Sequence, residues 1–146
     1  MKIKDLLFSV MAFIALFWAI SADADSLNKD IVISDAWVQA MPPSQTTTAA
    51  YMVITNNAAD KAVLVSASSD IAGAVEIHQM SEMDGMMNMA MASDIPIPPK
   101  GKVDLKPGGY HIMLINLKKP VNKGDMVSIM LHFQGAAEVL VQAQAR

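Results

Sequence analysis

Histidine and methionine occur together in two short segments of this 146-residue chain. The first runs from His78 to Met91 and combines one histidine with nearly half of the chain's 13 methionines. The second is His111-Ile112-Met113, in which the first and third residues would share a face of a strand, with Cα atoms about 6.5–7 Å apart. Imidazole and thioether groups on one face could bind a small metal ion.

The combination of these two ligand types selects among metals. Thioether sulfur is a soft, neutral ligand that suits Cu(I), a d10 ion that accepts trigonal or tetrahedral geometry. Zinc sites use Cys, His, Asp or Glu, and methionine is not a usual zinc ligand. Neutral ligands also leave the charge of the ion undercompensated, so binding should be moderate and a partner could extract the metal. The residue types therefore predict a Cu(I) site.

Composition excludes several other functions. The chain contains no cysteine, which rules out disulfides, CxxC redox chemistry, iron–sulfur clusters, a lipid-anchor cysteine and a Cys-ligated blue-copper site. A net charge of −3 and a single arginine, Arg146, argue against nucleic-acid binding, which normally needs a basic patch. The sequence also lacks a nucleophile elbow, a phosphate loop and a dinucleotide fingerprint, so we do not expect an enzyme.

Residues 1–24 have the features of a secretory signal peptide. Lys2 and Lys4 precede an uncharged apolar run over residues 6–20, and Ala22-Asp23-Ala24 fits an A-x-A cleavage site. The run is shorter than the roughly 20 residues of a spanning helix, so an uncleaved anchor is the less favoured alternative. We expect residues 25–146 to reach a bacterial periplasm as one domain without a membrane span.

The remaining chain is rich in short β-like runs. They cover residues 31–38, 48–56, 62–66, 74–83, 86–92, 102–105, 110–117, 126–133 and 138–143. Turn sequences such as Pro107-Gly108-Gly109 separate them, and the Pro-rich stretch 95–99 is interpreted as a crossover within one domain. This pattern predicts a single-domain, all-β fold, an antiparallel β-sandwich or barrel.

Alternation of side chains assigns the two faces of these strands. The apolar residues expected to face the core are Val75, Ile77, Val127, Ile129, Leu131 and Phe133. The same alternation turns His78 and Met80 away from this core. On the strand over 110–117, His111 and Met113 share one face, and Ile112 and Leu114 share the opposite one.

The segment between the first histidine and Met91 should form a β-hairpin, because Asp84-Gly85 is a strong signal for a two-residue turn. The expected cross-strand pairs are Met83 with Met86, Met80 with Met89, and His78 with Met91. A different loop length would shift this register. One face of the hairpin would then hold His78, Met80, Met87, Met89 and Met91. Residue types alone do not decide which of these methionines binds metal.

Four of these residues follow a spacing known from one family. Ten residues separate His78 from Met89, and twenty-one residues separate Met89 from His111-Ile112-Met113. This arrangement resembles the His-x10-Met-x21-His-x-Met motif of the periplasmic copper chaperones called PCuAC. Flanking segments agree as well, notably residues 75–78, 95–99 and 105–114. The upstream segment 49–56 is similar too, and the resemblance covers about residues 31–142.

The resemblance implies a cupredoxin-like, Greek-key β-sandwich that binds one Cu(I) near its surface through His78, Met89, His111 and Met113. It also implies delivery of copper to an apo acceptor, such as cytochrome c oxidase subunit II during assembly of its CuA centre, or a Sco-type protein. We expect a monomer that transfers the ion by ligand exchange. A periplasmic copper buffer without a dedicated acceptor and a structural β-sandwich whose methionines only pack are the alternatives.

We expect the other candidate metal-binding and charged residues to have structural roles, with the exception of the extra methionines of the hairpin. Met80, Met83, Met86, Met87 and Met91 exceed the motif, and we interpret them as a second, weaker site or as donors during ligand exchange. The residues expected to fill the core are Trp37, Met41, Met52 and Met126. His132 should be an ordinary surface or hydrogen-bonded histidine. The charges expected to be solvated around the hairpin are Glu76, Glu82 and Asp84.

Overall fold

The computed structural model describes residues 29–135 and 137–146, so the predicted signal peptide lies outside the described residues. The strands are β1 (Ile31–Val38), β2 (Thr47–Asn56), β3 (Ala62–Ser68), β4 (Ala72–Met83), β5 (Met86–Met91), β6 (Ile95–Ile97), β7 (Gly101–Leu105), β8 (Tyr110–Leu117), β9 (Met126–Phe133) and β10 (Glu138–Ala145). They pair in the order β5-β4-β8-β2-β1-β10-β9-β3-β6, and β7 pairs with β2 beside this path. The predicted all-β fold is confirmed.

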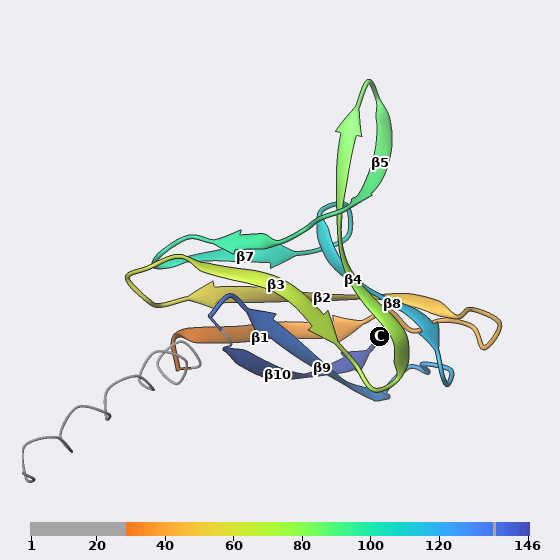
Figure 1. Ribbon diagram of the computed structural model, residues 1–146. Helices are drawn as coiled ribbons and strands as arrows, with labels where there is room; N and C mark the ends of the chain where they lie inside the picture. The colour runs from red at the N-terminus through yellow and green to blue at the C-terminus, as the bar shows by residue number, and fades with distance from the viewer. Residues whose placement is uncertain (1–28, 136) are drawn as a thin grey trace, which may run out of the picture.

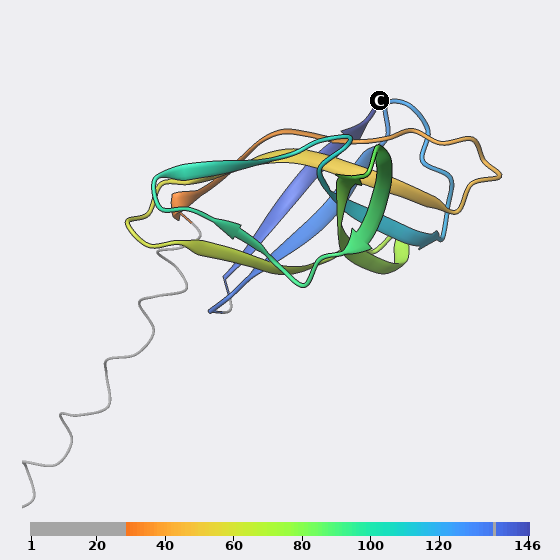
Figure 2. The same cartoon turned by 90° about the horizontal axis from the view of Figure 1, so that it is seen from above.

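The sheet folds back on itself into an elongated body with two layers (Figure 2). Strands β2 and β7 run along one side of this body, and β3 runs along the other (Figure 2). The β4–β5 hairpin projects from the body and stands well above it (Figure 1). Most pairings are antiparallel, and a short parallel pairing joins β1 to β10 through Trp37↔Gln144 and Val38↔Ala145.

All nine predicted runs are strands, and their ends agree within two residues. The Pro-rich stretch differs from its prediction because it contains a tenth strand, β6, which pairs with β3 through Ile97↔Ala62 and Ile95↔Leu64. Both isoleucines are fully buried. Strand β6 ends the sheet order, so Pro96, which has no N–H to donate, is tolerated on this edge.

The core confirms the predicted alternation along β9. Val127, Ile129, Leu131 and Phe133 are all buried, and Met52 on β2 is buried as predicted. Met41 is only half-buried. The prediction for Met126 is wrong, because this residue precedes Val127 on the outward face of β9 and is 56% exposed.

The turn between β7 and β8 determines where the segment His111-Ile112-Met113 begins. Gly109 N donates a hydrogen bond to Lys106 O at 3.0 Å, which closes a four-residue turn. Pro107 precedes Gly108, whose φ of 86° is the positive value that a type II turn requires at its third position. His111 follows two residues later on β8.

Replacing Gly108 with alanine should lower the free energy of unfolding by about 1–2 kcal/mol, because an L-side chain is strained at this positive φ. Urea denaturation would measure the change. Gly109→Ala is the matched control, since the glycine has no positive φ and an added Cβ would meet Lys106 O only at an ordinary 3.6 Å. It should change stability by less than about 0.5 kcal/mol. Equal losses in the two variants would contradict this account of the turn.

The hairpin turn also follows its prediction. Asp84 and Gly85 both have positive φ values, 52° and 75°, which is the backbone of a type I′ turn. The resulting pairs are His78↔Met91, Met80↔Met89 and Met83↔Met86, as predicted. Every residue of β5 is exposed. The register of the hairpin is therefore set by its turn rather than by packing against the body.

Candidate metal centre

The two histidines of the motif are direct neighbours in the structure. His78 on β4 and His111 on β8 are cross-strand partners. Their ring centroids are 5.7 Å apart, and the rings are inclined by 41°. His111 is buried, and the side chain of His78 is 15% exposed. Two residues that are distant in sequence therefore present adjacent imidazoles close to the surface.

Met113 lies on the same face of β8, two residues beyond His111. Its direct partner on β4 is Glu76, so Met113 is a diagonal neighbour of His78. Diagonal neighbours in an antiparallel pair are about 7–8 Å apart, which long side chains can span. Met113 is half-buried, so its thioether lies partly within the protein surface.

Met89 is also a diagonal neighbour of His78, but on the other side of the histidine pair. Its direct partner on β4 is Met80, whereas the direct partner of His78 is Met91. Met89 is 54% exposed. The structure thus arranges the other three motif residues around His78, and it adds Met91 as the thioether in the same cross-strand row as both histidines.

Hydrogen bonds occupy one nitrogen of each imidazole. His78 Nε2 lies 2.8 Å from Glu76 Oε2, and His111 Nδ1 lies 3.2 Å from Gly109 O. Because these oxygens can only accept, the nitrogen facing each of them must carry the proton. The lone pairs of the neutral rings are therefore on His78 Nδ1 and His111 Nε2. Among the described residues, His78 Nδ1 is buried without a hydrogen-bond partner. Its lone pair is therefore available to bind a metal ion.

The role of Glu76 corrects the sequence prediction. This residue was expected to be a solvated charge, but its carboxylate holds the ring of His78. A carboxylate that accepts a proton from a ligating histidine fixes the orientation of the ring and raises its basicity. The signal in the sequence is the two-residue spacing of Glu76 and His78, which places both side chains on one face of a strand.

Aromatic rings continue the histidine row into the body. The Tyr51 ring centroid lies 6.4 Å from that of His111 and 4.6 Å from that of Trp37, and the Arg146 guanidinium lies over the indole, 5.9 Å from its centroid. Burial raises the pKa of Tyr51, so its phenol stays protonated at neutral pH. Trp37 was expected in the core, but it is half-buried on this row because a bulge in β1 sets it opposite Tyr51.

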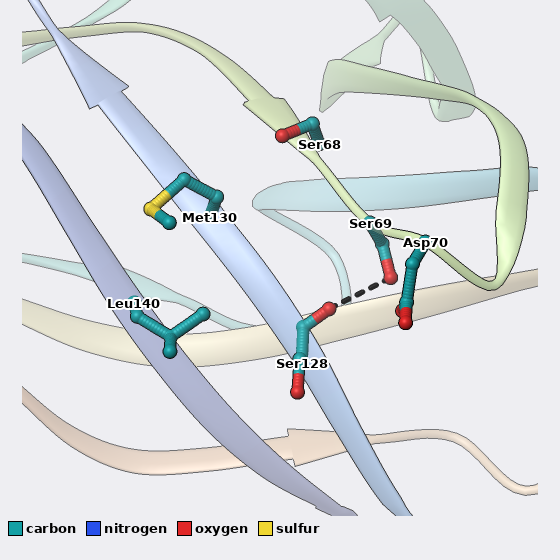
Figure 3. A pocket seen from close by; sticks show the side chains of 6 residues that line it. All are labelled: Ser68, Ser69, Asp70, Ser128, Met130 and Leu140. Atoms are coloured by element: carbon teal, nitrogen blue, oxygen red, sulfur yellow. Dashed lines mark hydrogen bonds between the residues drawn. The ribbon is translucent and has the colours of Figure 1, made fainter.

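The third histidine stands apart from this cluster. His132 on β9 lies within hydrogen-bonding distance of Ser68 Oγ at 3.0 Å and of Glu138 Oε1 at 3.1 Å. This confirms the prediction of a hydrogen-bonded surface histidine. Ser68 also lines an open groove, together with Ser69, Asp70, Ser128, Met130 and Leu140 (Figure 3). The Ser69 hydroxyl donates to Ser128 O there at 2.7 Å.

Hard ligands do not form a competing centre in the part of the chain that the structure describes. No three side chains of the types His, Asp and Glu converge there to hold a metal ion. The groups that could bind a metal are instead paired imidazoles surrounded by thioethers. Fold and cluster together define a class of small β-sandwich proteins that expose a His/Met site suited to a soft cation.

The chain belongs to the LpqE-like family, described as "Putative lipoprotein LpqE-like", whose model matches residues 31–145. A curated relative is the "Putative lipoprotein Lxx21020" of Leifsonia xyli subsp. xyli, which is 35% identical over 104 residues. The match covers 70% of this chain and 61% of that relative, so the chain spans about three fifths of its length.

Solved structures of copper-bound proteins have similar folds. The copper-bound PCuAC domain from PmoF2 superposes with a TM-score of 0.67 and 25% identity, covering 80% of this chain and 92% of that domain. The solution structure of Cu(I)-DR1885 from Deinococcus radiodurans has a TM-score of 0.64 and 34% identity, covering 79% and 76% of the two chains. The predicted cupredoxin-like β-sandwich and the predicted likeness to PCuAC domains are both supported.

Proposed function

We propose that this protein is a copper carrier, which binds one Cu(I) and passes it by ligand exchange to an apo acceptor. The observation that carries the proposal is the pair of adjacent imidazoles, each with one nitrogen facing an oxygen acceptor, and with His78 Nδ1 buried and without a hydrogen-bond partner among the described residues. Copper is also the metal of the similar structures described above.

In the proposed site, His78 Nδ1 and His111 Nε2 provide two ligands, and the thioethers of Met113 and Met89 provide the other two. All four are neutral, so the bound ion keeps its positive charge and its affinity stays moderate. Glu76 lies behind His78 and supplies a negative charge outside the ligand set. The site binds an ion without supplying a nucleophile or acid–base pair for a substrate, in keeping with a carrier rather than an enzyme.

The ligands differ in accessibility, which suits transfer. His111 is buried within the sheet, whereas Met89 is 54% exposed on the projecting hairpin. An acceptor can therefore reach the ion from the side of Met89, while ligands of this protein still hold it. Dissociation into free solution is avoided, because at least two protein ligands remain bound until the acceptor is engaged.

The cellular setting is part of the same proposal. Residues 1–24 act as a cleaved signal peptide, and residues 25–146 form the periplasmic copper-binding domain, with a core at about 31–142. The family description as a lipoprotein supports export. Over residues 29–135 and 137–146, no helix is long and apolar enough to cross a membrane. The acceptor we propose is the CuA-bearing subunit II of cytochrome c oxidase or a Sco-type protein, met by a monomeric carrier.

Anaerobic Cu(I) titration of the exported protein purified from the periplasm tests the central claim. We expect one equivalent to bind with a defined affinity, whereas a β-sandwich whose methionines only pack would bind none. Oxidase activity of a deletion strain at low copper tests the acceptor. Activity should fall if the protein delivers copper, and it should be unchanged if the protein is only a buffer.

Cu(I) binding should also quench the fluorescence of Trp37, which is the single tryptophan of residues 25–146. The expected cause is the stacked row that links His111 to Tyr51 and Trp37. Emission should decrease linearly and level off at one equivalent. The Trp37→Phe variant should lose the signal and keep the stoichiometry. Emission that does not respond while copper binds would contradict a site on this row.

A further inference from the structure

We propose that the outer part of the β4–β5 hairpin holds a second position for Cu(I), formed only by the thioethers of Met80, Met87 and Met89. This inference rests on the proposed function, because Met89 is common to the histidine site and the outer position. The ion would occupy the outer position on its way from the histidines to an acceptor.

The register brings these three thioethers to one patch. Met80 and Met89 are direct cross-strand partners, with Cβ atoms about 4.5–5.5 Å apart in ordinary sheet geometry. Met87 is two residues from Met89 on the same face of β5 and is a diagonal neighbour of Met80. Each separation can be spanned by flexible methionine side chains that share one ion.

Two local features hold this register. The positive φ values of Asp84 and Gly85 fix a two-residue turn, and a slip of one residue would turn every methionine of β5 to the other face. At the base of the hairpin, Met80 N donates a hydrogen bond to Gly109 O at 3.1 Å. The same carbonyl holds His111 Nδ1, so Met80 is tied to the histidine site.

Packing does not account for Met87 and Met89 on β5, although Met80 on β4 is half-buried. Met87 and Met89 are 52% and 54% exposed, and the hairpin stands clear of the body in Figure 1. Exposed thioethers in an exported protein are open to oxidation and contribute little burial. Met83 and Met86 are exposed as well, but they lie on the opposite face and present only two sulfurs. The face that continues from the histidines carries four, those of Met80, Met87, Met89 and Met91, and Met91 lies in the row of the histidines.

The chemistry of the outer position differs from that of the inner site. Three neutral sulfurs satisfy a trigonal Cu(I), and Glu82, the direct partner of Met87, supplies a nearby negative charge. During transfer, the bonds from copper to His78, His111 and Met113 break and bonds to Met80 and Met87 form, while Met89 stays bound. The ion remains Cu(I) throughout, so no electron or proton has to be supplied.

The test removes the inner site and asks what remains. The His78→Ala/His111→Ala variant of the exported protein is titrated with Cu(I) under anaerobic conditions against a chromogenic Cu(I) chelator. We expect it to keep one equivalent with affinity about 100-fold or more below that of the unmodified protein. Adding Met80→Leu and Met87→Leu should abolish this binding. Adding Met83→Leu and Met86→Leu, the matched change on the other face, should leave it intact.

A second measurement keeps both histidines, in case their removal unfolds the chain. In the Met80→Leu/Met87→Leu variant, equilibrium affinity should stay within about twofold of the unmodified protein. Extraction of Cu(I) by excess chelator should slow several-fold, while the Met83→Leu/Met86→Leu variant should release copper at the unmodified rate. Equal release rates in the two variants would overturn the outer position.

The two proposals fail in different ways. If the double-histidine variant binds no Cu(I) while the unmodified protein binds one equivalent, the outer position is wrong and the carrier site stands. If both proteins bind copper with the same affinity, and Met80→Leu/Met87→Leu abolishes that binding, the hairpin position stands and the histidine site is wrong.

Discussion

Replacement of His78 with alanine should lower the affinity for Cu(I) by about 100-fold or more. Loss of a residue behind a metal ligand typically costs 10–100-fold in affinity, so loss of a ligand itself should cost at least the upper end of that range. His78 is the residue around which the other three are arranged, and its ring nitrogen Nδ1 is buried without a partner. Competition with a chromogenic Cu(I) chelator under anaerobic conditions would measure the affinity.

The matched control for this variant is His132→Ala. His132 is also partly exposed on a strand and bonded to a glutamate, but it lies on β9, away from the His/Met cluster. Its replacement should change the affinity by no more than about twofold. An unchanged affinity in the His78→Ala variant, or equal losses in the two variants, would contradict the assignment of the site.

The parts of this fold that depend on local chemistry follow from the sequence. The hairpin register is one example, because Asp84-Gly85 permits the positive φ values of a type I′ turn and thereby pairs His78 with Met91. The faces of β9 are another, since alternation along this strand identifies the core side. The predicted core residues Val127, Ile129, Leu131 and Phe133 are accordingly all buried.

Features that depend on non-local pairing could not be predicted in the same way. The adjacent placement of the His78 and His111 rings follows from the pairing of β4 with β8, which no local pattern in the sequence specifies. Trp37 faces Tyr51 only because a bulge in β1 shifts the register against β2. A tryptophan in a β-rich run is expected in the core, so nothing local in the sequence indicates this outward position.

The choice between Met89 and Met91 as a ligand also cannot be predicted from strand alternation alone. The motif selects Met89, whereas direct pairing with His78 is made by Met91. Both lie on the correct face, and alternation cannot separate them because they are two residues apart on one strand. The strand register therefore does not distinguish the two thioethers as ligands.

Glu76 provides the second large effect on copper affinity. We expect Glu76→Ala to weaken Cu(I) binding by about 10–100-fold, because the carboxylate holds the proton on His78 Nε2 and so keeps the lone pair on Nδ1. Glu76→Gln should lose less, since its amide oxygen can still accept the hydrogen bond but carries no charge. The same anaerobic chelator competition would give both affinities.

Glu76 is proposed to act by fixing the tautomer of the His78 ring. Measuring that tautomer distinguishes this role from a general loss of structure. Nitrogen NMR of the copper-free protein should show the His78 proton on Nε2 in the unmodified chain and in Glu76→Gln, and a mixture of tautomers in Glu76→Ala. Glu138→Ala is the matched control, because it removes a carboxylate from His132 at a similar distance. It should leave both the His78 tautomer and the copper affinity unchanged. If Glu76→Ala keeps full affinity, or loses affinity while the tautomer is unaltered, Glu76 does not position the ligand in this way.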